Sequence, residues 1–443
     1  MREKSFYLVS LGCAKNTVDS ESIATLLSQN GYQGVNKPSQ ASVLIVNTCG
    51  FIAPARQESL DVLQELASKK KPGQLLVAAG CLTERSRQLM SDTIEGVDGF
   101  IGTRRWMDVI EAIDQLRQSP QPLRYALPET ATIGTDEKGV PRTALQGASA
   151  YLKIADGCRR PCAFCSIPLI KGTAVSRSPE SIIRDAKLLQ EAGTQELILI
   201  AQDTTDYGSD LGMKEGLATL LDRLLPEIPD IPWVRVLYAY PGYVTDRLIE
   251  VMASHPQMLH YLDIPLQHAS IEVLKSMKRP ANMEWVRNTL SKMRAAMPDL
   301  ALRTTFIVGY PGETESQFQM LLDFMEEIKF DHAGAFTFSF EPGTASEPLG
   351  DPIPEPIKQE RLERLMKLQE KISLGNNQRW IGKKMEILIE GIGDGISVGR
   401  SFRDAPEIDG LVLIEDEAEV GSIMPVQITG AMTHDLSARL ITP

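Results

Sequence analysis

Cysteine is the residue of this chain best suited to chemistry, because its six copies form two groups of three. We call one the compact triplet, which has the spacing C-x3-C-x2-C, and the other the dispersed triplet. The compact triplet is Cys158, Cys162 and Cys165, and the dispersed triplet is Cys13, Cys49 and Cys81. In a chain of 443 residues with no secretory segment expected, such grouping predicts metal or redox chemistry rather than a disulfide framework.

The compact triplet places three thiolates in one short loop, which suits an iron–sulfur cluster. Zinc usually takes four ligands in closed pairs, and neither a second cysteine pair nor a nearby histidine occurs here. A cluster with three protein ligands leaves one iron open to a substrate or cofactor. The alternative is three buried cysteines without a metal.

Each cysteine of the dispersed triplet directly follows a short apolar run that is typical of a buried parallel strand. Because the carboxyl ends of parallel strands meet at one edge of a sheet, the three thiols are expected to converge. A glycine beside each one would let the backbone approach a bulky cluster: Gly12, Gly50 and Gly80. A single buried cysteine would suggest a core residue, but three in the same position favour a second cluster.

These thiols require elements that position them, and the apolar periodicity predicts two α/β units followed by a small unit of strands. Residues 1–117 alternate between strands at 5–11, 41–47 and 74–79 and helices near 20–28, 55–68 and 84–90, as in a βαβ domain. Residues 118–143 are rich in Pro, Gln, Thr and Gly and are predicted to be a linker. The remaining residues divide into a barrel-like series at 144–378 and a terminal unit at 379–443.

The series at 144–378 has six strand candidates with helical patterns between them: 151–155, 196–201, 234–238, 261–265, 302–308 and 333–338. Six βα units fit a full or partial (β/α)6 barrel. A long helix at 357–378 is expected to leave this domain. The compact triplet follows the first strand, in a βα loop of the kind that carries chemistry in barrels.

The terminal unit at 379–443 has five short apolar runs: 385–389, 396–402, 411–414, 423–428 and 436–441. Gly, Asp and Pro separate them, which predicts a small antiparallel barrel of a kind that often binds nucleic acid. It contains 6 Lys and Arg against 11 Asp and Glu, a net charge of 6 − 11 = −5.

The compact triplet, with the aromatic Phe164 before its last cysteine, resembles the motif of the radical S-adenosylmethionine (SAM) superfamily. The resemblance implies that Cys158, Cys162 and Cys165 hold a 4Fe-4S cluster whose open iron binds SAM. One electron from the reduced cluster would then cleave SAM to methionine and a 5′-deoxyadenosyl radical.

Nearly the whole chain resembles the radical SAM methylthiotransferases. The matching stretches are SLGCAKNTVDSE at 10–21, VNTCGF at 46–51, AGCL at 79–82, LDIPLQHAS at 262–270 and RTTFIVGYPGETE at 303–315. The resemblance implies an N-terminal methylthiotransferase domain, a radical SAM core and a TRAM domain. It also implies that Cys13, Cys49 and Cys81 hold a second 4Fe-4S cluster, which supplies sulfur, and that a second SAM supplies the methyl group.

The family has branches with different substrates. Two modify an adenosine of transfer RNA that carries an isopentenyl or a threonylcarbamoyl group, and a third modifies the β-carbon of an aspartate in ribosomal protein S-twelve. The stretches GRSFRDAPEIDG at 399–410 and YLKIADGC at 151–158 resemble the third branch. A barrel that grips RNA should be basic, whereas an acidic one suits a basic ribosomal protein. We therefore expect the ribosomal protein as substrate, with isopentenyl-adenosine transfer RNA as the alternative.

Five polar residues near the predicted strands are expected from the resemblance to contact SAM: Gln202, Asp203, Tyr207, Gln267 and Arg303. Each has an ordinary alternative. Asp203 could cap a local turn, and Arg303 could pair with a nearby acid. Asp263 and His268 flank the end of the fourth strand, where His268 has a hydrogen bond within its own loop as its alternative.

Other charged residues are weaker candidates. Lys15, Asn16 and Asp19 follow Cys13, where they would shape the open face of the cluster, although helix capping by Asn16 is the favoured interpretation. Four arginines are candidates for contacts with phosphate: Arg159, Arg160, Arg400 and Arg403.

The bulk composition agrees with an ordinary globular protein, with 43% hydrophobic and 23% charged residues. No apolar run approaches the roughly 18 residues that a membrane span requires, so we expect no membrane association and a cytoplasmic location. The formal net charge of −12 argues against a protein that binds extensively along a nucleic-acid backbone. A radical SAM enzyme also needs an electron-donor protein as a partner.

Overall fold

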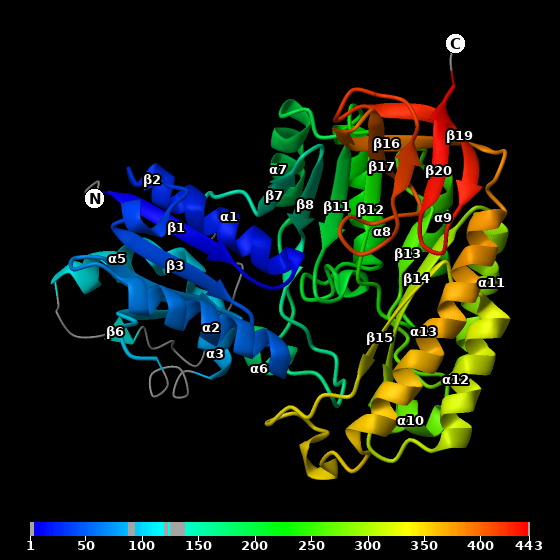
Figure 1. Cartoon of the computed structure of the whole chain (residues 1–443), viewed down its shortest axis with the longest axis horizontal. Helices are drawn as coiled ribbons and strands as arrows, with labels where there is room; N and C mark the ends of the chain where they lie inside the picture. The colour runs from blue at the N-terminus through cyan, green and yellow to red at the C-terminus, as the bar shows by residue number, and fades with distance from the viewer. Residues whose placement is uncertain (1–3, 87–93, 119–122, 125–137, 442–443) are drawn as a thin grey trace.

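The computed structural model describes residues 4–86, 94–118, 123–124 and 138–441. Figure 1 shows three bodies: an N-terminal α/β domain, a curved central sheet lined by helices, and a small terminal barrel. This is the predicted fold class, and the prediction is confirmed. None of the described helices has both the length and the apolar character needed to span a bilayer.

The N-terminal sheet has six parallel strands in the order β2-β1-β3-β4-β5-β6. The strands are Gln33–Gly34 (β2), Ser5–Ser10 (β1), Val43–Thr48 (β3), Leu75–Gly80 (β4), Gly99–Gly102 (β5) and Leu123–Arg124 (β6). β3 is buried along its entire length, as the apolar run predicted. The short strands β2, β5 and β6 were not predicted, and β6 lies within the predicted linker, most of which is outside the described residues.

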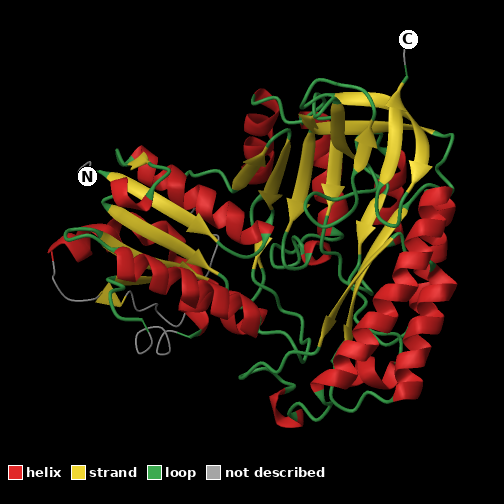
Figure 2. Ribbon diagram, in the orientation of Figure 1, coloured by secondary structure: helices red, strands yellow, loops and turns green. Residues whose placement is uncertain are grey.

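Helices cover both faces of this sheet (Figure 2). They are Ala14–Gln29 (α1), Ala53–Lys69 (α2), Cys81–Arg85 (α3) and Val109–Gln118 (α5), with single turns at Pro38–Gln40 and Thr103–Asp108. The predicted helix at 84–90 begins earlier, at Cys81, and residues 87–93 lie outside the described part of the chain. α1 and α2 confirm the other two predicted helices.

The central domain is a partial barrel made from two sheets, in the orders β12-β11-β8-β7 and β13-β14-β15. A bridge between Val234 and Met258 lies where the two sheets adjoin. The six predicted strands are all present: Ser149–Lys153 (β8), Glu196–Ile200 (β11), Trp233–Val236 (β12), Tyr261–Asp263 (β13), Ala301–Val308 (β14) and His332–Thr337 (β15). Short segments at Thr143–Gln146 (β7), Ala155–Asp156 (β9) and Val175–Ser176 (β10) add antiparallel pairs.

Helices on the outer face of the partial barrel bury its largest apolar core. They are Pro179–Glu191 (α7), Gly216–Leu224 (α8), Asp246–Ser254 (α9), Ile271–Ser276 (α10), Met283–Ala296 (α11), Glu315–Ile328 (α12) and Glu355–Gln378 (α13), with single turns at Thr204–Asp206, Leu225–Glu227 and Glu347–Leu349. The short helix Ile167–Lys171 (α6) instead lies against α3 of the N-terminal domain (Figure 1). α12 begins with a capping box, in which the side chains of Thr314 and Gln317 each accept from the other residue's backbone N–H group. Contrary to the prediction, α13 stays with this domain, since Gln369 and Ser373 donate to backbone carbonyls before β15.

The terminal unit is a closed five-stranded barrel in the order β16-β17-β18-β20-β19. Its strands are Lys384–Gly393 (β16), Ile396–Ser401 (β17), Val412–Ile414 (β18), Ile423–Ala431 (β19) and Leu436–Leu440 (β20). All pairs are antiparallel except β18 with β20, so the predicted barrel is confirmed with one parallel pair. Alternate residues such as Ile387 and Ile389 fill its core.

The two outer bodies contact opposite ends of the central strands. In Figure 1 the small barrel lies over the tails of β11 and β12, which we call the floor of the central barrel. The arrowheads of β1 and β3 point toward the central domain, so the N-terminal domain presents its strand ends to it. The end of the central barrel where its strands terminate is called the mouth.

Candidate active site

The compact triplet lies in the loop between β9 and α6, at the mouth. Backbone N–H groups point at two of its sulfurs: Arg160 donates to Cys158 Sγ at 3.4 Å and Ile167 to Cys165 Sγ at 3.5 Å. The Arg279 guanidinium approaches Cys162 Sγ at 3.5 Å. These donors stabilise thiolates, which are the form that binds iron.

Burial acts against the thiolates while no cluster is bound. Desolvation is the main cause that raises the pKa of Cys158 to about 11 and that of Cys165 to about 12, and the neighbouring cysteines of the triplet contribute to both values. Binding to positively charged iron reverses this balance, because the metal supplies the charge that the apolar surroundings lack.

The dispersed triplet is assembled by strand register. Ser10 pairs with Asn47 and Thr48 with Gly80, so the chain ends that follow β1, β3 and β4 lie side by side. A side chain added at Gly12, which has φ +94°, would lie 3.0 Å from Cys49 Sγ. Glycine is therefore required where the first loop crosses the second cysteine.

Asn16 holds the loops of the dispersed triplet together. Its Nδ2 donates to the carbonyls of Leu11 at 2.7 Å and Thr48 at 3.1 Å, and its Oδ1 lies 3.7 Å from Cys81 Sγ. The favoured prediction that Asn16 caps α1 is wrong, since the N-cap is Cys13 and has no side-chain cap. The amide instead bridges three strand ends, which sequence periodicity does not reveal.

The thiols of the dispersed triplet differ in acidity. Burial is the main cause that raises the pKa of Cys81 to about 12, and the neighbouring Cys13 and Cys49 contribute to this rise. For Cys13, burial is outweighed by the charge of Lys15 and by the backbone N–H of Asn16, which together lower its pKa. Although Cys13 is exposed as a residue and the other five cysteines are partly buried, the groups packed around its sulfur still desolvate it.

The loops of the two triplets touch each other. Ser166, next to Cys165, donates through Oγ to the carbonyl of Phe51 at 3.2 Å, and Phe51 is two residues beyond Cys49. Arg104 donates to the carbonyl of Ile170 in α6 at 3.0 Å. The two groups of cysteines therefore belong to one site between the N-terminal domain and the mouth.

A buried charge cluster lies beside this site, and the sequence alone predicts no role for most of its members. Asp19 of α1 contacts Lys153 Nζ at 2.6 Å, Lys171 Nζ at 2.8 Å and the Arg142 guanidinium. Asp156 lies 2.9 Å from Lys153. In the sequence, only the position of Lys153 at the end of an apolar strand indicates such a cluster. The cluster fixes α1, which follows Cys13, against the segments that flank the compact triplet.

Two of the predicted SAM contacts have an unsatisfied atom at the mouth. The Oε1 atoms of Gln202 and Gln267 are buried and have no hydrogen-bond partner among the described residues. Gln267 also has a positive φ of 75°, a conformation that costs free energy and is common at functional sites. A buried amide oxygen without a donor costs about 1–3 kcal/mol, so both atoms are suited to accept from a ligand.

Asp203 and Tyr207 are engaged with the protein. Asp203 accepts from Arg160 Nε at 2.5 Å and from the Thr205 hydroxyl at 2.5 Å, which includes the turn contact given as its alternative. The Tyr207 hydroxyl donates to the carbonyl of Arg177 at 2.9 Å and is buried. These residues shape the loop that lies against the compact triplet.

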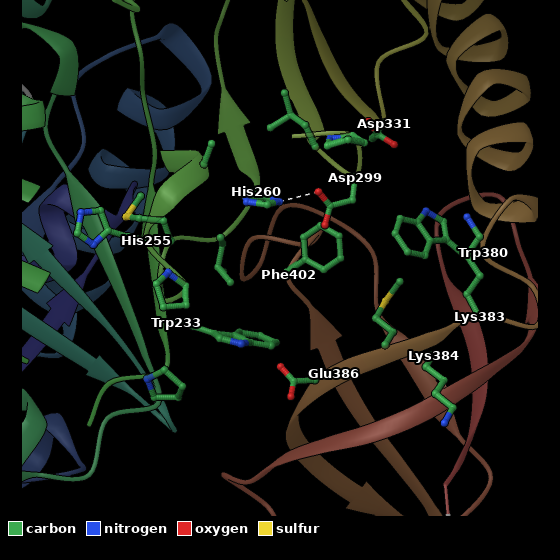
Figure 3. Close-up of a pocket in the computed structure, with 18 of the residues that line it drawn as sticks. Trp233, His255, His260, Asp299, Asp331, Trp380, Lys383, Lys384, Glu386 and Phe402 are labelled. Atoms are coloured by element: carbon green, nitrogen blue, oxygen red, sulfur yellow. Dashed lines mark hydrogen bonds and ion pairs between the residues drawn. The ribbon is translucent and has the colours of Figure 1, made fainter. Parts of the chain in front are cut away.

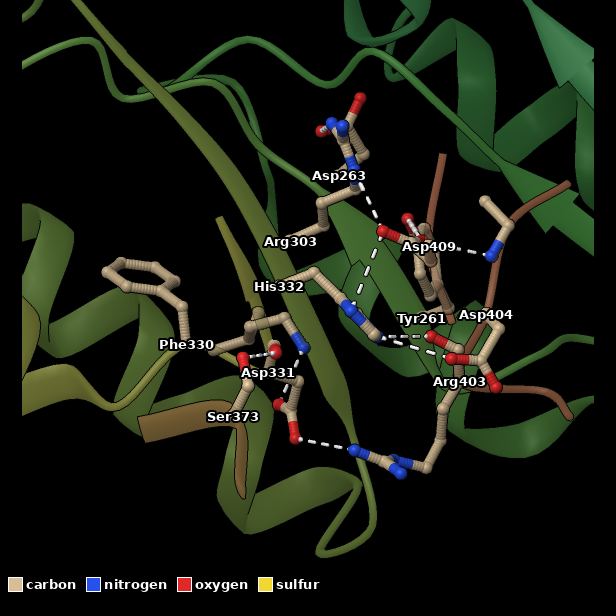
Figure 4. Close-up of polar contacts among 12 residues, drawn as sticks. Tyr261, Asp263, Arg303, Phe330, Asp331, His332, Ser373, Arg403, Asp404 and Asp409 are labelled. Carbon is tan, nitrogen blue, oxygen red and sulfur yellow. Dashed lines mark hydrogen bonds and ion pairs between the residues drawn. The ribbon is translucent and has the colours of Figure 1, made fainter. Parts of the chain in front are cut away.

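Arg303 lies between two acids (Figure 4). Its guanidinium contacts Asp263 at 3.1 Å and Asp409, from the small barrel, at 3.2 Å. His332 also faces Asp409. The ion pair given as the alternative for Arg303 is therefore present, and it joins the central and terminal barrels.

His268, Arg400 and Arg403 are also paired. His268 accepts from the backbone N–H of Ser270 at 2.9 Å, the loop contact expected for it. Arg400 is buried against Glu196 at 2.6 Å, and Arg403 lies 3.4 Å from Asp331. The suggestion that Arg400 and Arg403 contact phosphate is wrong for this structure, because burial removes both from solvent.

The cysteines fit clusters better than single ions. Among the described residues, no group of three or more His, Cys, Asp or Glu side chains is arranged to hold one metal ion. A 4Fe-4S cluster is larger, so its ligands need to stand further apart than those of zinc. Three sulfur donors at each triplet match the ligand chemistry of such clusters.

A cleft of about 1090 Å³ opens at the floor, away from the cysteines (Figure 3). Trp233 and His260 of the central barrel face Trp380 and Phe402 of the terminal part across it. It contains none of the predicted site residues. The size of a cavity therefore does not identify the reactive end of this protein.

Comparison with known proteins agrees with the division of the chain into three domains. Family models match at residues 5–102 (uncharacterized protein family UPF0004), 152–325 (radical SAM superfamily) and 381–441 (TRAM domain). The chain is 46% identical to the ribosomal protein uS12 methylthiotransferase RimO of Roseiflexus sp. (strain RS-1), across 98% of this chain and 97% of that protein. The chain belongs to the ribosomal protein uS12 methylthiotransferase family. The RimO protein of Chloroflexus aurantiacus is 45% identical, across 97% and 98% of the two chains.

Solved structures support the fold of this methylthiotransferase. The radical SAM methyltransferase TsrM of Kitasatospora setae has a TM-score of 0.58 at 13% identity, covering 78% of this chain and 74% of that one. The cobalamin-dependent radical SAM enzyme OxsB has a TM-score of 0.51 at 14% identity, covering 84% and 56%. Membership of the radical SAM superfamily implies a 4Fe-4S cluster and SAM as cofactors.

Proposed function

We propose that this chain transfers a methylthio group to the β-carbon of an aspartate in ribosomal protein uS12. The observation that carries the proposal is the contact between the two cysteine loops, through Ser166 and Phe51. A reactive carbon radical must meet its sulfur before it diffuses away, and adjacent sites in one enclosure satisfy that requirement.

Each triplet is assigned to one 4Fe-4S cluster with three cysteine ligands. When bound, the cluster and SAM at Cys158, Cys162 and Cys165 supply a 5′-deoxyadenosyl radical, and the second cluster supplies sulfur. The backbone donors to the compact triplet hold its thiolates in place. Asn16 fixes the three loops of the dispersed triplet, and the Asp19 charge cluster keeps that domain against the mouth.

The amide oxygens of Gln202 and Gln267 are assigned to SAM, because they are buried at the mouth and accept from no described donor. Asp203 positions Arg160 beside the compact triplet. Tyr207 supports the same loop from inside. Arg303 contributes through Asp263, the carboxylate at the end of β13, and not as a free cation.

The choice of a protein substrate is supported by the terminal barrel. The net charge of residues 379–443 is 6 − 11 = −5, and two of its arginines are buried in ion pairs. Such a surface repels a phosphate backbone and attracts a basic ribosomal protein. We also propose the division at 1–117, 118–143, 144–378 and 379–443, an electron-donor protein as partner, and a cytoplasmic location.

The test compares two substrates under the same conditions. Reduced enzyme with both clusters reconstituted is incubated with SAM and either uS12 or transfer RNA that carries isopentenyl-adenosine. We expect a mass increase of one methylthio group on an aspartate of uS12 and none on the RNA. Methylthio product on RNA alone would replace the proposal with the transfer-RNA reaction. Mass spectrometry of uS12 from cells with and without the enzyme gives the matching result in vivo.

A further inference from the structure

Lys15 is a lysine without an ion-pair partner at the centre of this site, and the Cys13 thiol, whose pKa it lowers, is assigned to the second cluster. Its side chain is 9% exposed, and its ammonium lies 3.0 Å from the centre of the Tyr238 ring. It forms no ion pair and no hydrogen bond with any residue in the described part of the chain. A ring face provides some electrostatic stabilisation but no lone pair for the ammonium donors.

The neighbouring buried lysines behave differently. Lys153 and Lys171 enter the same interface, and both contact Asp19 at 2.8 Å or less. Buried cations are normally paired in this way because desolvation is costly. Lys15 is the exception among these three, although it is only four residues from Asp19 on the same helix.

The position of Lys15 joins the two halves of the site. It is two residues beyond Cys13, and the ring that it contacts follows β12 of the central barrel. Tyr238 has a positive φ of 66°, which is strained for a bulky residue. Its backbone N–H donates to Asp263 at 3.2 Å, and Arg303 contacts the same carboxylate. The Asp263 carboxylate, which lies near Lys15 at the mouth, is thus already paired with Arg303.

The Lys15 ammonium is therefore suited to pair with an anionic group of a bound ligand. SAM belongs at the compact triplet, whereas Lys15 is on the loop of the dispersed triplet, where sulfur is supplied. The carbon that receives sulfur must come to this loop. In an aspartate, that β-carbon is bonded directly to the side-chain carboxylate, so the carboxylate arrives at the same place.

We propose that Lys15 binds the side-chain carboxylate of the target aspartate and holds its β-carbon beside the dispersed triplet. This inference rests on the proposed function and adds the residue that recognises the target. A buried charge-assisted hydrogen bond of this kind contributes to affinity and, by fixing one end of a short side chain, to orientation. It also explains how an isopentenyl-adenosine, which has no carboxylate, is rejected.

The test exchanges the two partners in turn. Wild type, Lys15→Met and Lys15→Arg are assayed with uS12 that carries either aspartate or asparagine at the modified position, and methylthio product is quantified by mass spectrometry. Lys4→Met is the matched control, because Lys4 also lies over a tyrosine ring, Tyr32, at 5.5 Å, but at the other end of the domain. Iron content and cleavage of SAM without substrate are measured for every variant.

We expect wild type and Lys4→Met to prefer aspartate over asparagine by about 30-fold in kcat/KM, which corresponds to about 2 kcal/mol. Lys15→Met should lose this preference while it keeps its iron and cleaves SAM, and Lys15→Arg should recover part of it. An unchanged preference in Lys15→Met would overturn the inference. If Lys15→Met loses iron, Lys15→Gln repeats the comparison, and iron loss there too would show that the lysine serves the cluster. No product from wild type with aspartate would instead reject the proposed function.

Discussion

The mouth and the floor of the central barrel differ in how their polar groups are satisfied. At the mouth, Lys15 and the amide oxygens of Gln202 and Gln267 have no charged or hydrogen-bonded partner among the described residues. At the floor, Glu196 is buried between Arg235 at 2.7 Å and Arg400 at 2.6 Å. The mouth thus leaves a cation and two acceptors open to ligands, whereas the floor pairs its buried charges within the protein, although Arg235 Nη2 has no hydrogen-bond partner among the described residues.

This difference follows from the geometry of parallel barrels. Loops after the strands can vary freely and carry reactive groups, while loops before them close the core. Here the floor is also the surface on which the small barrel is mounted, through Arg400 and through Asp409. Substitutions at the mouth should therefore change activity more than stability, and substitutions at the floor the reverse.

The largest effect is expected at the mouth. Cys158→Ala should reduce SAM cleavage to background, because the cluster that binds SAM loses a ligand. Cys49→Ala should still release 5′-deoxyadenosine but form no methylthio product. Chromatography of 5′-deoxyadenosine and mass spectrometry of uS12 measure the two steps separately. Methylthio product from Cys49→Ala would contradict the division of labour between the triplets.

At the floor, Arg400→Ala should destabilise the protein by about 3–5 kcal/mol, because it leaves Glu196 buried with one partner fewer. Urea unfolding followed by circular dichroism gives the change in the free energy of unfolding. SAM cleavage per folded molecule at low temperature should stay within about twofold of wild type. If Arg400→Ala lost activity without losing stability, Arg400 would serve ligand binding or catalysis, and the contrast between mouth and floor would be wrong.

The floor also has a defined acid response. Arg235 and Arg400 outweigh the burial that would raise the pKa of Glu196 and lower it from 4.5 to about 2. A lowered pKa means that the ion pairs contribute fully above pH 4.5 and are lost as the pH falls toward 2. The lowered pKa of Glu196 corresponds to about 3 kcal/mol of stability, because a change of one in pKa corresponds to about 1.4 kcal/mol. The free energy of unfolding is measured for wild type and Glu196→Gln between pH 6 and pH 3. It should decrease less on acidification in the variant than in wild type.

The same contrast explains which features the sequence predicted. The compact triplet is encoded by local spacing, and the six strands by local apolar runs, so both could be predicted directly. The dispersed triplet required one topological assumption, that its strands are parallel neighbours, and the register bears this out. The role of Asn16 and the pairing of Arg303 with Asp409 depend on contacts between segments far apart in sequence, which periodicity does not encode.

The smallest effect should come from an exposed ion pair on the wall between mouth and floor. Arg287 and Glu327 join α11 and α12 at 2.7 Å, with side chains 43% and 46% exposed. Water already solvates both charges, so Arg287→Ala should cost only about 0.2–1 kcal/mol and leave activity unchanged. The short contact is similar to that of Glu196 with Arg400, and only the burial differs. If urea unfolding gave equal losses for Arg287→Ala and Arg400→Ala, then ion pairing itself, and not its burial at the floor, would account for the stability of that end.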